Sequence, residues 1–187
     1  MKRISVFVSG NGTNLQRIAE YFKEHGGVEI ANVVCNNPKA YAIERAKNLG
    51  IPLRMINKQE FNSPEFTEEM RSLNLDLIVL AGFLWKIPSS LIQAYPKQIV
   101  NIHPALLPKY GGKGFYGEHV HEAVVAAKEA FSGITVHYVN EIYDSGEIIL
   151  QAQVALDPDE TPDSLAAKIH VLEQENYPKT IEKLLKR

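Results

Sequence analysis

Short apolar runs alternate with amphipathic segments through the first half of the chain. The sequence predicts buried β-strands at residues 4–8, 29–35, 53–56, 76–82 and 99–103. Between them, apolar residues recur at helical spacing and predict helices at residues 13–25, 41–49, 64–73 and 89–94. Strands that alternate with helices in this way predict a mostly parallel sheet with helices on both faces and right-handed crossovers.

The second half of the chain is less regular. A glycine-rich segment at residues 104–117 is a candidate functional loop, because long loops in compact domains often bind ligands. The elements predicted after it are a helix at 118–130, two β-rich runs at 133–140 and 148–156, and a closing helix at 163–186. We expect the two β-rich runs to pair as a hairpin and the last helix to bend at Pro178. One α/β domain over residues 1–187 accounts for this pattern.

The composition is that of an ordinary globular protein. The 187 residues are 45% hydrophobic, and 20 Lys and Arg against 22 Asp and Glu leave a net charge of −2. Nucleic acid is not an expected partner, because the chain lacks the basic excess that holds a polyanion. The first apolar run is far shorter than the ~20 residues of a membrane span, and the single Cys35 cannot form an internal disulfide. We therefore expect a cytoplasmic protein with no membrane partner.

The first candidate site follows the first predicted strand, at Gly10-Asn11-Gly12-Thr13-Asn14. A glycine turn that leads into a helix N-terminus, capped here by Thr13 or Asn14, exposes backbone N–H groups that bind anions such as phosphate. The dinucleotide pattern would need glycine in place of Leu15, and the Walker pattern would need Gly-Lys-Ser/Thr, so NAD and ATP are disfavoured. A plain tight turn without a ligand fits the same residues.

The second candidate site combines Asn101 and His103 at the end of a predicted strand. Side chains two residues apart share a face of the strand, so both point from the edge where open parallel sheets bind ligands. An amide can donate to a developing oxyanion while an imidazole transfers a proton. Asp144, in a predicted turn, is expected to face His103 and to raise the pKa of its imidazole. Taken singly, a packed histidine and a turn aspartate explain the same residues.

Metal binding and covalent hydrolysis have little support. Glu118, His119, His121 and Glu122 spread around one turn of a predicted helix, without the i, i+4 histidine pair of metalloproteases. No Gly-x-Ser-x-Gly elbow occurs, and Cys35 lies in the middle of a strand. We expect no metal site.

Five motifs occur in order along the chain. They are Ser9-Gly10-Asn11-Gly12-Thr13-Asn14-Leu15, Leu80-Ala81-Gly82-Phe83, Asn101-Ile102-His103-Pro104-Ala105-Leu106-Leu107-Pro108-Lys109-Tyr110, Thr135-Val136-His137, and Asp144-Ser145-Gly146 with Ile149-Leu150-Gln151. Together they closely resemble the phosphoribosylglycinamide formyltransferase family of de novo purine synthesis, over nearly the whole chain. The resemblance implies a single-domain, Rossmann-like formyltransferase fold with a C-terminal β-hairpin and helix. Its N-terminal half would bind the ribonucleotide, and its C-terminal half would bind folate and hold the catalytic groups.

The resemblance also implies the reaction, which moves a formyl group from 10-formyltetrahydrofolate to the amine of 5-phosphoribosylglycinamide. Asn101, His103 and Asp144 match the catalytic trio of the family. Asn101 and a protonated His103 would stabilise the tetrahedral oxyanion, and His103 would then protonate the departing folate nitrogen. The partners would be small molecules, no metal or covalent intermediate is needed, and the protein would be a monomer or a homodimer.

The same matching implies two sets of binding residues. The acceptor substrate would contact Gly12, Thr13, Asn14, His170 and Glu173. The folate would contact Leu84, Trp85, Lys86, Ile87, Asn101, Asn140, Glu141, Ile142, Tyr143 and Asp144, where an apolar wall suits a flat pterin ring. Many relatives carry glutamine at the position of His170 and an arginine near that of Pro64. The loop at residues 111–117 looks longer than in many members, and its Lys113 could reach a phosphate or the glutamate tail of folate.

Other functions fit part of the pattern. Formyltetrahydrofolate deformylases and methionyl-tRNA formyltransferases share the trio but normally carry an extra domain, for which we expect no room in 187 residues. Sugar N-formyltransferases also formylate an amine, although the turn at residues 10–14 favours a phosphorylated ribose. A catalytically silent binding module is the alternative outside the enzyme class, and the intact trio argues against it.

Overall fold

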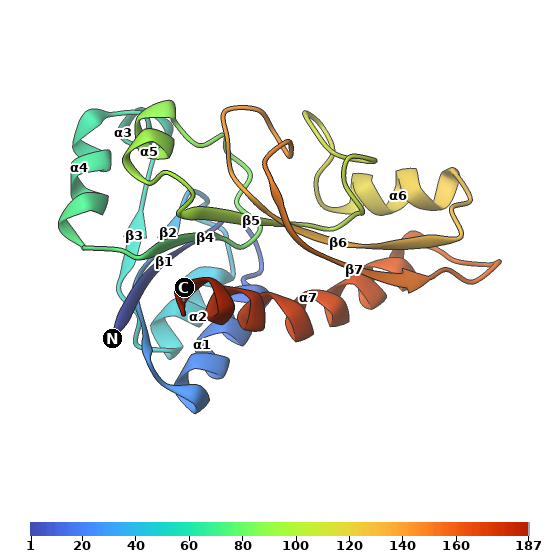
Figure 1. The fold of residues 1–187 in the computed structure, drawn as a ribbon, viewed down its shortest axis with the longest axis horizontal. Helices are drawn as coiled ribbons and strands as arrows, with labels where there is room; N and C mark the ends of the chain where they lie inside the picture. The colour runs from blue at the N-terminus through green and yellow to red at the C-terminus, as the bar shows by residue number, and fades with distance from the viewer. Residues whose placement is uncertain (187) are drawn as a thin grey trace.

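The computed structural model describes residues 1–186, and within them the strands form one seven-stranded sheet (Figure 1). The strands are β1 (Lys2–Val8), β2 (Val28–Cys35), β3 (Leu53–Met55), β4 (Leu77–Leu80), β5 (Ile99–His103), β6 (Phe131–Tyr138) and β7 (Ile148–Ala155). The helices are α1 (Thr13–His25), α2 (Ala42–Asn48), α3 (Lys58–Phe61), α4 (Pro64–Ser72), α5 (Ser89–Ala94), α6 (Glu118–Ala126) and α7 (Pro162–Leu185).

The strand order β3-β2-β1-β4-β5-β6-β7 creates a crevice at the carboxyl edge of the sheet. Strands β1 to β5 are parallel, whereas β6 pairs antiparallel with both β5 and β7. The chain runs outward from β1 through β2 to β3 and then returns to place β4 on the other side of β1. The loops after β1 and β4 therefore diverge, and such a switch point is where open α/β sheets bind ligands.

Alternation along the strands produces two apolar layers. In β1, Ile4 and Val6 pack into one layer with α1, α2, α6 and α7, and Phe7 packs into the other with α3, α4 and α5. Figure 1 shows α1, α2 and α7 on one side of the sheet and α3, α4 and α5 on the other. The prediction of a mostly parallel sheet with helices on both faces, a β-hairpin and a closing helix is confirmed.

Helix α3 was not predicted, although the sequence contains its signal. The Asn57 side chain accepts a hydrogen bond from the Glu60 N–H at 2.9 Å, and the Glu60 carboxylate accepts one from the Asn57 N–H at 3.1 Å. This reciprocal pair is a capping box, which starts a helix even when only one turn follows.

Two helix ends differ from the prediction. The N-cap of α1 is Gly12, in the left-handed conformation with φ 77°, and neither Thr13 nor Asn14 caps the helix. Helix α6 ends at Ala126 and not at residue 130, because Lys128 turns the chain with a φ of 51°. The sequence Ala126-Ala127-Lys128 does not predict such a turn.

Helix α7 continues through Pro178 and contacts the neighbouring parallel strands β4 and β5. The neighbouring Tyr177 is fully buried, and its hydroxyl donates to the carbonyl of Leu80 at 2.8 Å, with the carbonyl of Val100 at 3.3 Å. Over residues 1–186, none of the helices combines the length and the apolar character that crossing a membrane requires.

Candidate active site

A cavity of about 580 Å³ opens at the carboxyl edge of the sheet, where the loops after β1, β4 and β5 meet the β6–β7 loop and α7. All but one of the predicted site residues line it. These are Gly12, Thr13, Asn14, Leu84, Trp85, Lys86, Ile87, Asn101, His103, Asn140, Ile142, Tyr143, Asp144, His170 and Glu173. The exception is Glu141, whose side chain is exposed outside the cavity wall. Glu141 is an exposed residue of the β6–β7 loop, and its assignment to the folate site stays a prediction.

The turn after β1 holds its shape through close packing. A side chain at Gly12 would bring its Cβ within 2.7 Å of the Cβ of Ala42, and the φ of 77° also favours glycine. The Arg45 guanidinium donates to the Asn11 carbonyl and to the Asn11 side chain at 2.9 and 2.8 Å. Since no side chain caps α1, the N–H groups of its first turn border the cavity without an internal acceptor. These features suit a bound phosphate.

Helix α7 contributes the wall beside this turn. The Asn14 amide donates to the Glu173 carboxylate at 3.0 Å, which connects the start of α1 to α7. The same carboxylate lies 3.8 Å from the Nδ1 atom of His170 and raises the pKa of that imidazole above its ordinary value. The two predicted acceptor-binding residues of α7 are thus one electrostatic pair.

Asn101 and His137 are cross-strand neighbours, because β5 and β6 pair them directly. The Asn101 amide nitrogen lies 3.2 Å from Nε2 of His137, and Nδ1 of His137 lies 2.9 Å from the carbonyl oxygen of Tyr138. A carbonyl only accepts, so Nδ1 carries a proton, and in a neutral imidazole Nε2 then accepts from the amide. This arrangement aims one amide N–H at His137 and leaves the second available to a bound oxygen.

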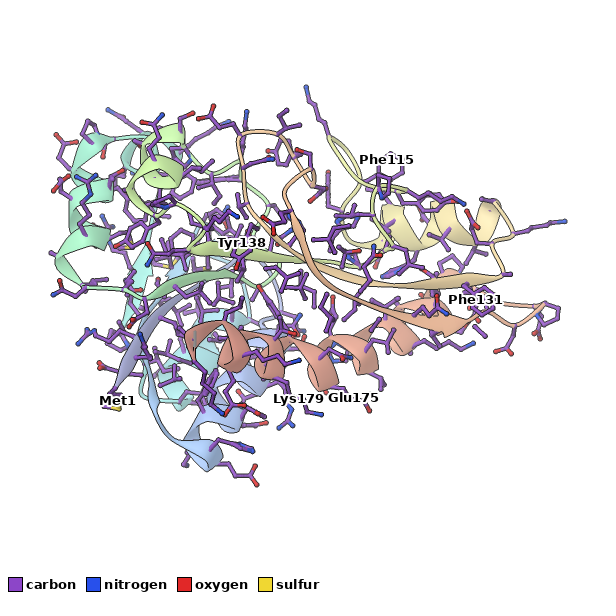
Figure 2. The ribbon with its side chains drawn as sticks, in the orientation of Figure 1. Met1, Phe115, Phe131, Tyr138, Glu175 and Lys179 are labelled. Atoms are coloured by element: carbon purple, nitrogen blue, oxygen red, sulfur yellow. The ribbon has the colours of Figure 1, made fainter. Side chains whose placement is uncertain are left out.

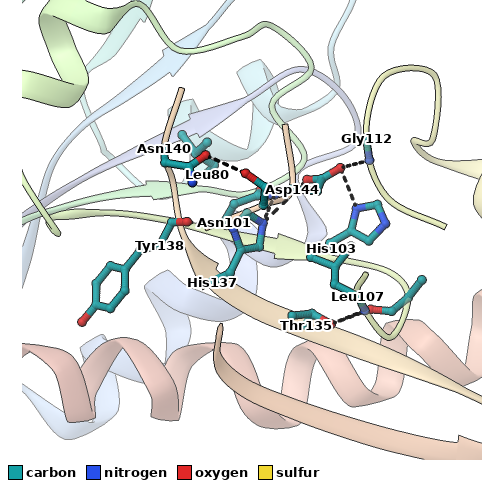
Figure 3. Close-up of polar contacts among 12 residues, drawn as sticks. Leu80, Asn101, His103, Leu107, Gly112, Thr135, His137, Tyr138, Asn140 and Asp144 are labelled. Carbon is teal, nitrogen blue, oxygen red and sulfur yellow. Dashed lines mark hydrogen bonds and ion pairs between the residues drawn. The ribbon is translucent and has the colours of Figure 1, made fainter. Parts of the chain in front are cut away.

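His103, at the end of β5, is only 4% exposed; it faces the Asp144 carboxylate (Figure 3) and the carbonyl of Tyr110. Its Nε2 atom lies 2.7 Å from the Tyr110 carbonyl oxygen, and its Nδ1 atom lies 3.6 Å from the Asp144 carboxylate. Burial lowers the pKa of His103 below its ordinary value of 6.5, and the raising effects of Asp144 and of the Tyr110 carbonyl do not outweigh burial. Asp144 therefore faces His103 as predicted. In the free protein desolvation has the larger effect and favours the neutral imidazole, whereas the protonated His103 inferred from the sequence stays a prediction for the reaction itself.

Asp144, on the β6–β7 loop, lies between the side chains of His103 and His137 (Figure 3). Its carboxylate lies 3.6 Å from His103 and 3.6 Å from His137, and it accepts a hydrogen bond from the Gly112 N–H at 3.0 Å. Burial raises the pKa of Asp144, but the nearby imidazoles of His137 and His103 and the Gly112 N–H together hold it below its ordinary value. The carboxyl group is therefore ionised at neutral pH. Two residues later, position 146 requires glycine, because a Cβ there would overlap the Tyr138 carbonyl oxygen.

Side-chain hydrogen bonds from β6 and β7 hold the loop after His103 in place. The Thr135 hydroxyl donates to the Ala105 carbonyl at 2.7 Å and accepts from the Leu107 N–H at 3.0 Å. The Gln151 amide then donates to the Leu107 carbonyl at 2.9 Å. These bonds anchor the start of the loop whose Tyr110 carbonyl meets the imidazole of His103.

The segment after β4 forms the apolar part of the cavity. The Leu84 N–H donates to the hydroxyl of Ser9 at 3.0 Å, which ties this segment to the turn after β1. The Trp85 ring packs against Phe61 with centroids 5.6 Å apart. Phe115, on the loop that leads into α6 (Figure 2), also borders the cavity. Pro64, by contrast, starts α4 and does not line the cavity.

His137 and Thr135 belong to a sequence motif, but neither was predicted to have a role of its own. Their roles can be inferred only from the register of β5 and β6, which pairs His137 with Asn101 and Thr135 with His103. The Glu118 to Glu122 segment does not gather ligands, since His119 is exposed and His121 is buried. In the part of the chain that the structure describes, no group of three His, Cys, Asp or Glu side chains is placed to hold a metal ion.

The chain is similar to known formyl transferases. The sequence profile of the formyl transferase family matches residues 2–181. Phosphoribosylglycinamide formyltransferase of Bacillus subtilis is 38% identical over 191 residues, which cover 99% of this chain and 95% of that protein. The chloroplastic phosphoribosylglycinamide formyltransferase of Arabidopsis thaliana is 40% identical over 176 residues, which cover 90% of this chain and 60% of that protein. This chain thus spans about 60% of the length of the plant relatives.

Solved structures agree with this likeness. The crystal structure of phosphoribosylglycinamide formyltransferase from Bacillus halodurans has a TM-score of 0.89 at 34% identity, covering 100% of this chain and 96% of that chain. The corresponding structure from Streptococcus pneumoniae has a TM-score of 0.86 at 36% identity, covering 98% and 99%.

Proposed function

The chain belongs to the phosphoribosylglycinamide formyltransferase family, and from this premise we propose that it transfers the formyl group of 10-formyltetrahydrofolate to the amine of 5-phosphoribosylglycinamide. The products are the N-formyl compound and tetrahydrofolate, in de novo purine synthesis. The observation that supports this most strongly is that Asn101, His103 and Asp144 share one cavity with an uncapped helix N-terminus that suits a phosphate.

The acceptor substrate spans the cavity from the turn after β1 to the trio. Its phosphate binds the N–H groups of Gly12, Thr13 and Asn14, where the positive end of α1 favours a dianion. Glu173 and His170 on α7 contact the part of the acceptor between its phosphate and its amine. Both side chains line the cavity and form one charged pair.

The formyl donor binds the apolar part of the cavity. A flat pterin ring fits against the segment Leu84, Trp85, Lys86 and Ile87 and against the loop residues Asn140, Ile142 and Tyr143, all of which line the cavity. The Asn140 side chain accepts hydrogen bonds from the Ile142 N–H at 2.9 Å and the Ser145 hydroxyl at 3.0 Å, which orders this loop. The donor then presents its formyl carbon to the trio.

In the reaction, the acceptor amine attacks the formyl carbon and forms a tetrahedral oxyanion. The free N–H of the Asn101 amide donates to this oxyanion. Neutral His103 takes the proton that the attacking nitrogen loses and delivers it to the folate nitrogen as the carbon–nitrogen bond to folate breaks. Asp144 stabilises the transient imidazolium through its charge. One proton leaves the amine and one arrives on folate, so the step balances without a covalent enzyme intermediate.

The setting of the reaction follows from the same premise. We expect residues 1–187 to act as one formyltransferase domain on small molecules in the cytoplasm, as a monomer or homodimer. The net charge of −2 gives no support to nucleic acid as a partner.

Substitution of His103 tests the assignment of the proton carrier. His103→Ala is expected to lower kcat by ~100-fold or more, because the proton transfer loses its acid and base. The matched control is His119→Ala, an exposed histidine that lies 3.4 Å from Glu122 and packs edge-on against Tyr116, and it should leave kcat unchanged. A His103→Ala variant with the activity of the control would refute the mechanism.

A further inference from the structure

His121 is a buried imidazole in the middle of α6 that none of the interactions above uses. The residue is 8% exposed, and its Nδ1 atom has no hydrogen-bond partner within residues 1–186. Buried polar atoms are almost always paired with protein or water, because an unpaired one loses the hydrogen bond that it made to water when the chain was unfolded. Because the His121 residue also lines the cavity, its unpaired imidazole nitrogen is a candidate for a bond completed when a ligand binds.

The surroundings of His121 identify which ligand lies in reach. Helix α6 packs against α7, and His121 shares the cavity wall with His170 and Glu173 of α7. Its charge interactions are with Glu173, Glu118 and His103. His121 thus borders the region between the proposed phosphate turn and the trio, where the ribose and glycinamide groups of the acceptor would lie.

The charge state of His121 limits the chemistry of that ligand. Burial lowers the pKa of His121 below its ordinary value, although Glu173 and Glu118 act in the opposite direction, and His103 lowers it further. A neutral imidazole offers one N–H and one lone pair. Such a group can donate to and accept from a ribose hydroxyl or an amide, both of which carry a donor and an acceptor.

On the basis of the proposed formyl transfer, we propose that His121 is a substrate-binding residue. Its Nδ1 atom forms a hydrogen bond with a ribose hydroxyl or with the glycinamide amide of the acceptor. The acceptor thereby gains a contact from α6 opposite those of α7, which orients its amine toward His103. Binding supplies the partner that Nδ1 lacks in the free protein.

The test compares three single variants of the full chain. His121→Leu removes both nitrogens at similar volume, and His121→Asn keeps a polar atom near the position of Nδ1. His119→Leu is the matched control on the same helix, since its side chain is 63% exposed. For each variant, steady-state kinetics give KM for each substrate separately, isothermal titration gives Kd for 5-phosphoribosylglycinamide, and urea unfolding gives the midpoint.

His121→Leu is expected to raise KM and Kd for the acceptor by ~10-fold or more, the equivalent of one lost hydrogen bond. The KM of the formyl donor should stay within about twofold, a change of less than ~0.5 kcal/mol. His121→Asn should recover most of the acceptor affinity, and the unfolding midpoint of His121→Leu should not fall, because an unpaired buried atom has been removed.

Three results would overturn the inference. Unchanged acceptor Kd in His121→Leu, with or without a lower unfolding midpoint, would assign His121 a structural role. An equal rise in KM for both substrates would place the defect in the shared reaction centre. Wild-type protein that neither binds nor turns over the acceptor would overturn the proposed function and this inference together, whereas normal wild-type turnover isolates the test of His121.

Discussion

Substitution of Gly12 by alanine tests the proposed phosphate turn through both stability and binding. A left-handed backbone conformation costs an alanine about 1–2 kcal/mol. The new Cβ would also lie 2.7 Å from the Cβ and 2.9 Å from the Cα of Ala42, an overlap that typically costs about 1–3 kcal/mol to relieve. We therefore expect the free energy of unfolding to fall by about 2–5 kcal/mol in total. The protein should still fold, since domains are stable by about 5–15 kcal/mol.

The functional effect of Gly12→Ala comes from displacement of the turn. Because charge-assisted bonds to a phosphate contribute about 1.5–3 kcal/mol each, loss of one should raise KM for the acceptor by ~10-fold or more. Urea unfolding and acceptor kinetics measure the two effects. Gly10→Ala is the control for stability, because no atom lies within 4 Å of a Cβ at Gly10. An unfolding free energy for Gly12→Ala within ~0.5 kcal/mol of this control would refute the packing argument.

Three further substitutions test the reaction centre and its support. Asp144→Asn removes a charge that raises the pKa of His103. Because the neutral form of His103 accepts the proton, activity is lost as pH falls through the pKa of His103. The acid limb of the kcat/KM profile should therefore move to lower pH in this variant. Its kcat should also fall by about 10-fold or more, because unit charges 3.6 Å apart interact by ~1–5 kcal/mol at effective dielectric constants of about 20–80; an unmoved limb would contradict this reasoning. His137→Leu frees the Asn101 amide to rotate, so kcat should fall by about 10- to 100-fold while both KM values stay close to wild type, and an unchanged kcat would argue against the amide role. Tyr177→Phe removes a buried hydroxyl that meets two strand carbonyls at 2.8 and 3.3 Å, and urea titration should show a loss of about 1–3 kcal/mol, against no measurable loss if these bonds are weak.

The sheet could be read from the sequence because strand and helix periodicities differ and alternate clearly. Ile4, Val6 and Phe7 are buried on two sides of one strand, as a continuous apolar run in a parallel sheet predicts. Helix ends were harder to predict. The left-handed conformation of Lys128 at the end of α6 has no evident signal in the sequence. The Asn57–Glu60 capping box of α3, by contrast, was present in the sequence and was overlooked.

The site was predictable where residues share a strand and less so where strands must be paired. Asn101 and His103 lie two residues apart on β5, so their common face follows from local geometry. The role of His137 depends on antiparallel register with β5. The pKa of His103 depends on how deeply the β6–β7 loop and the loop after β5 bury it, and no sequence pattern sets that depth. Glu141 was assigned to the folate site by its match to the family; in the structure its side chain is exposed and does not line the cavity.

Acceptor-dependent release of folate tests the central claim most directly. The absorbance of 10-formyl-5,8-dideazafolate is followed with wild-type protein alone, with 5-phosphoribosylglycinamide, and with an amino sugar nucleotide. The account predicts turnover only with 5-phosphoribosylglycinamide. Release that ignores the acceptor would indicate a deformylase, turnover with the sugar nucleotide would indicate a different acceptor, and silence in every reaction would indicate a binding protein; each of these results would contradict the account.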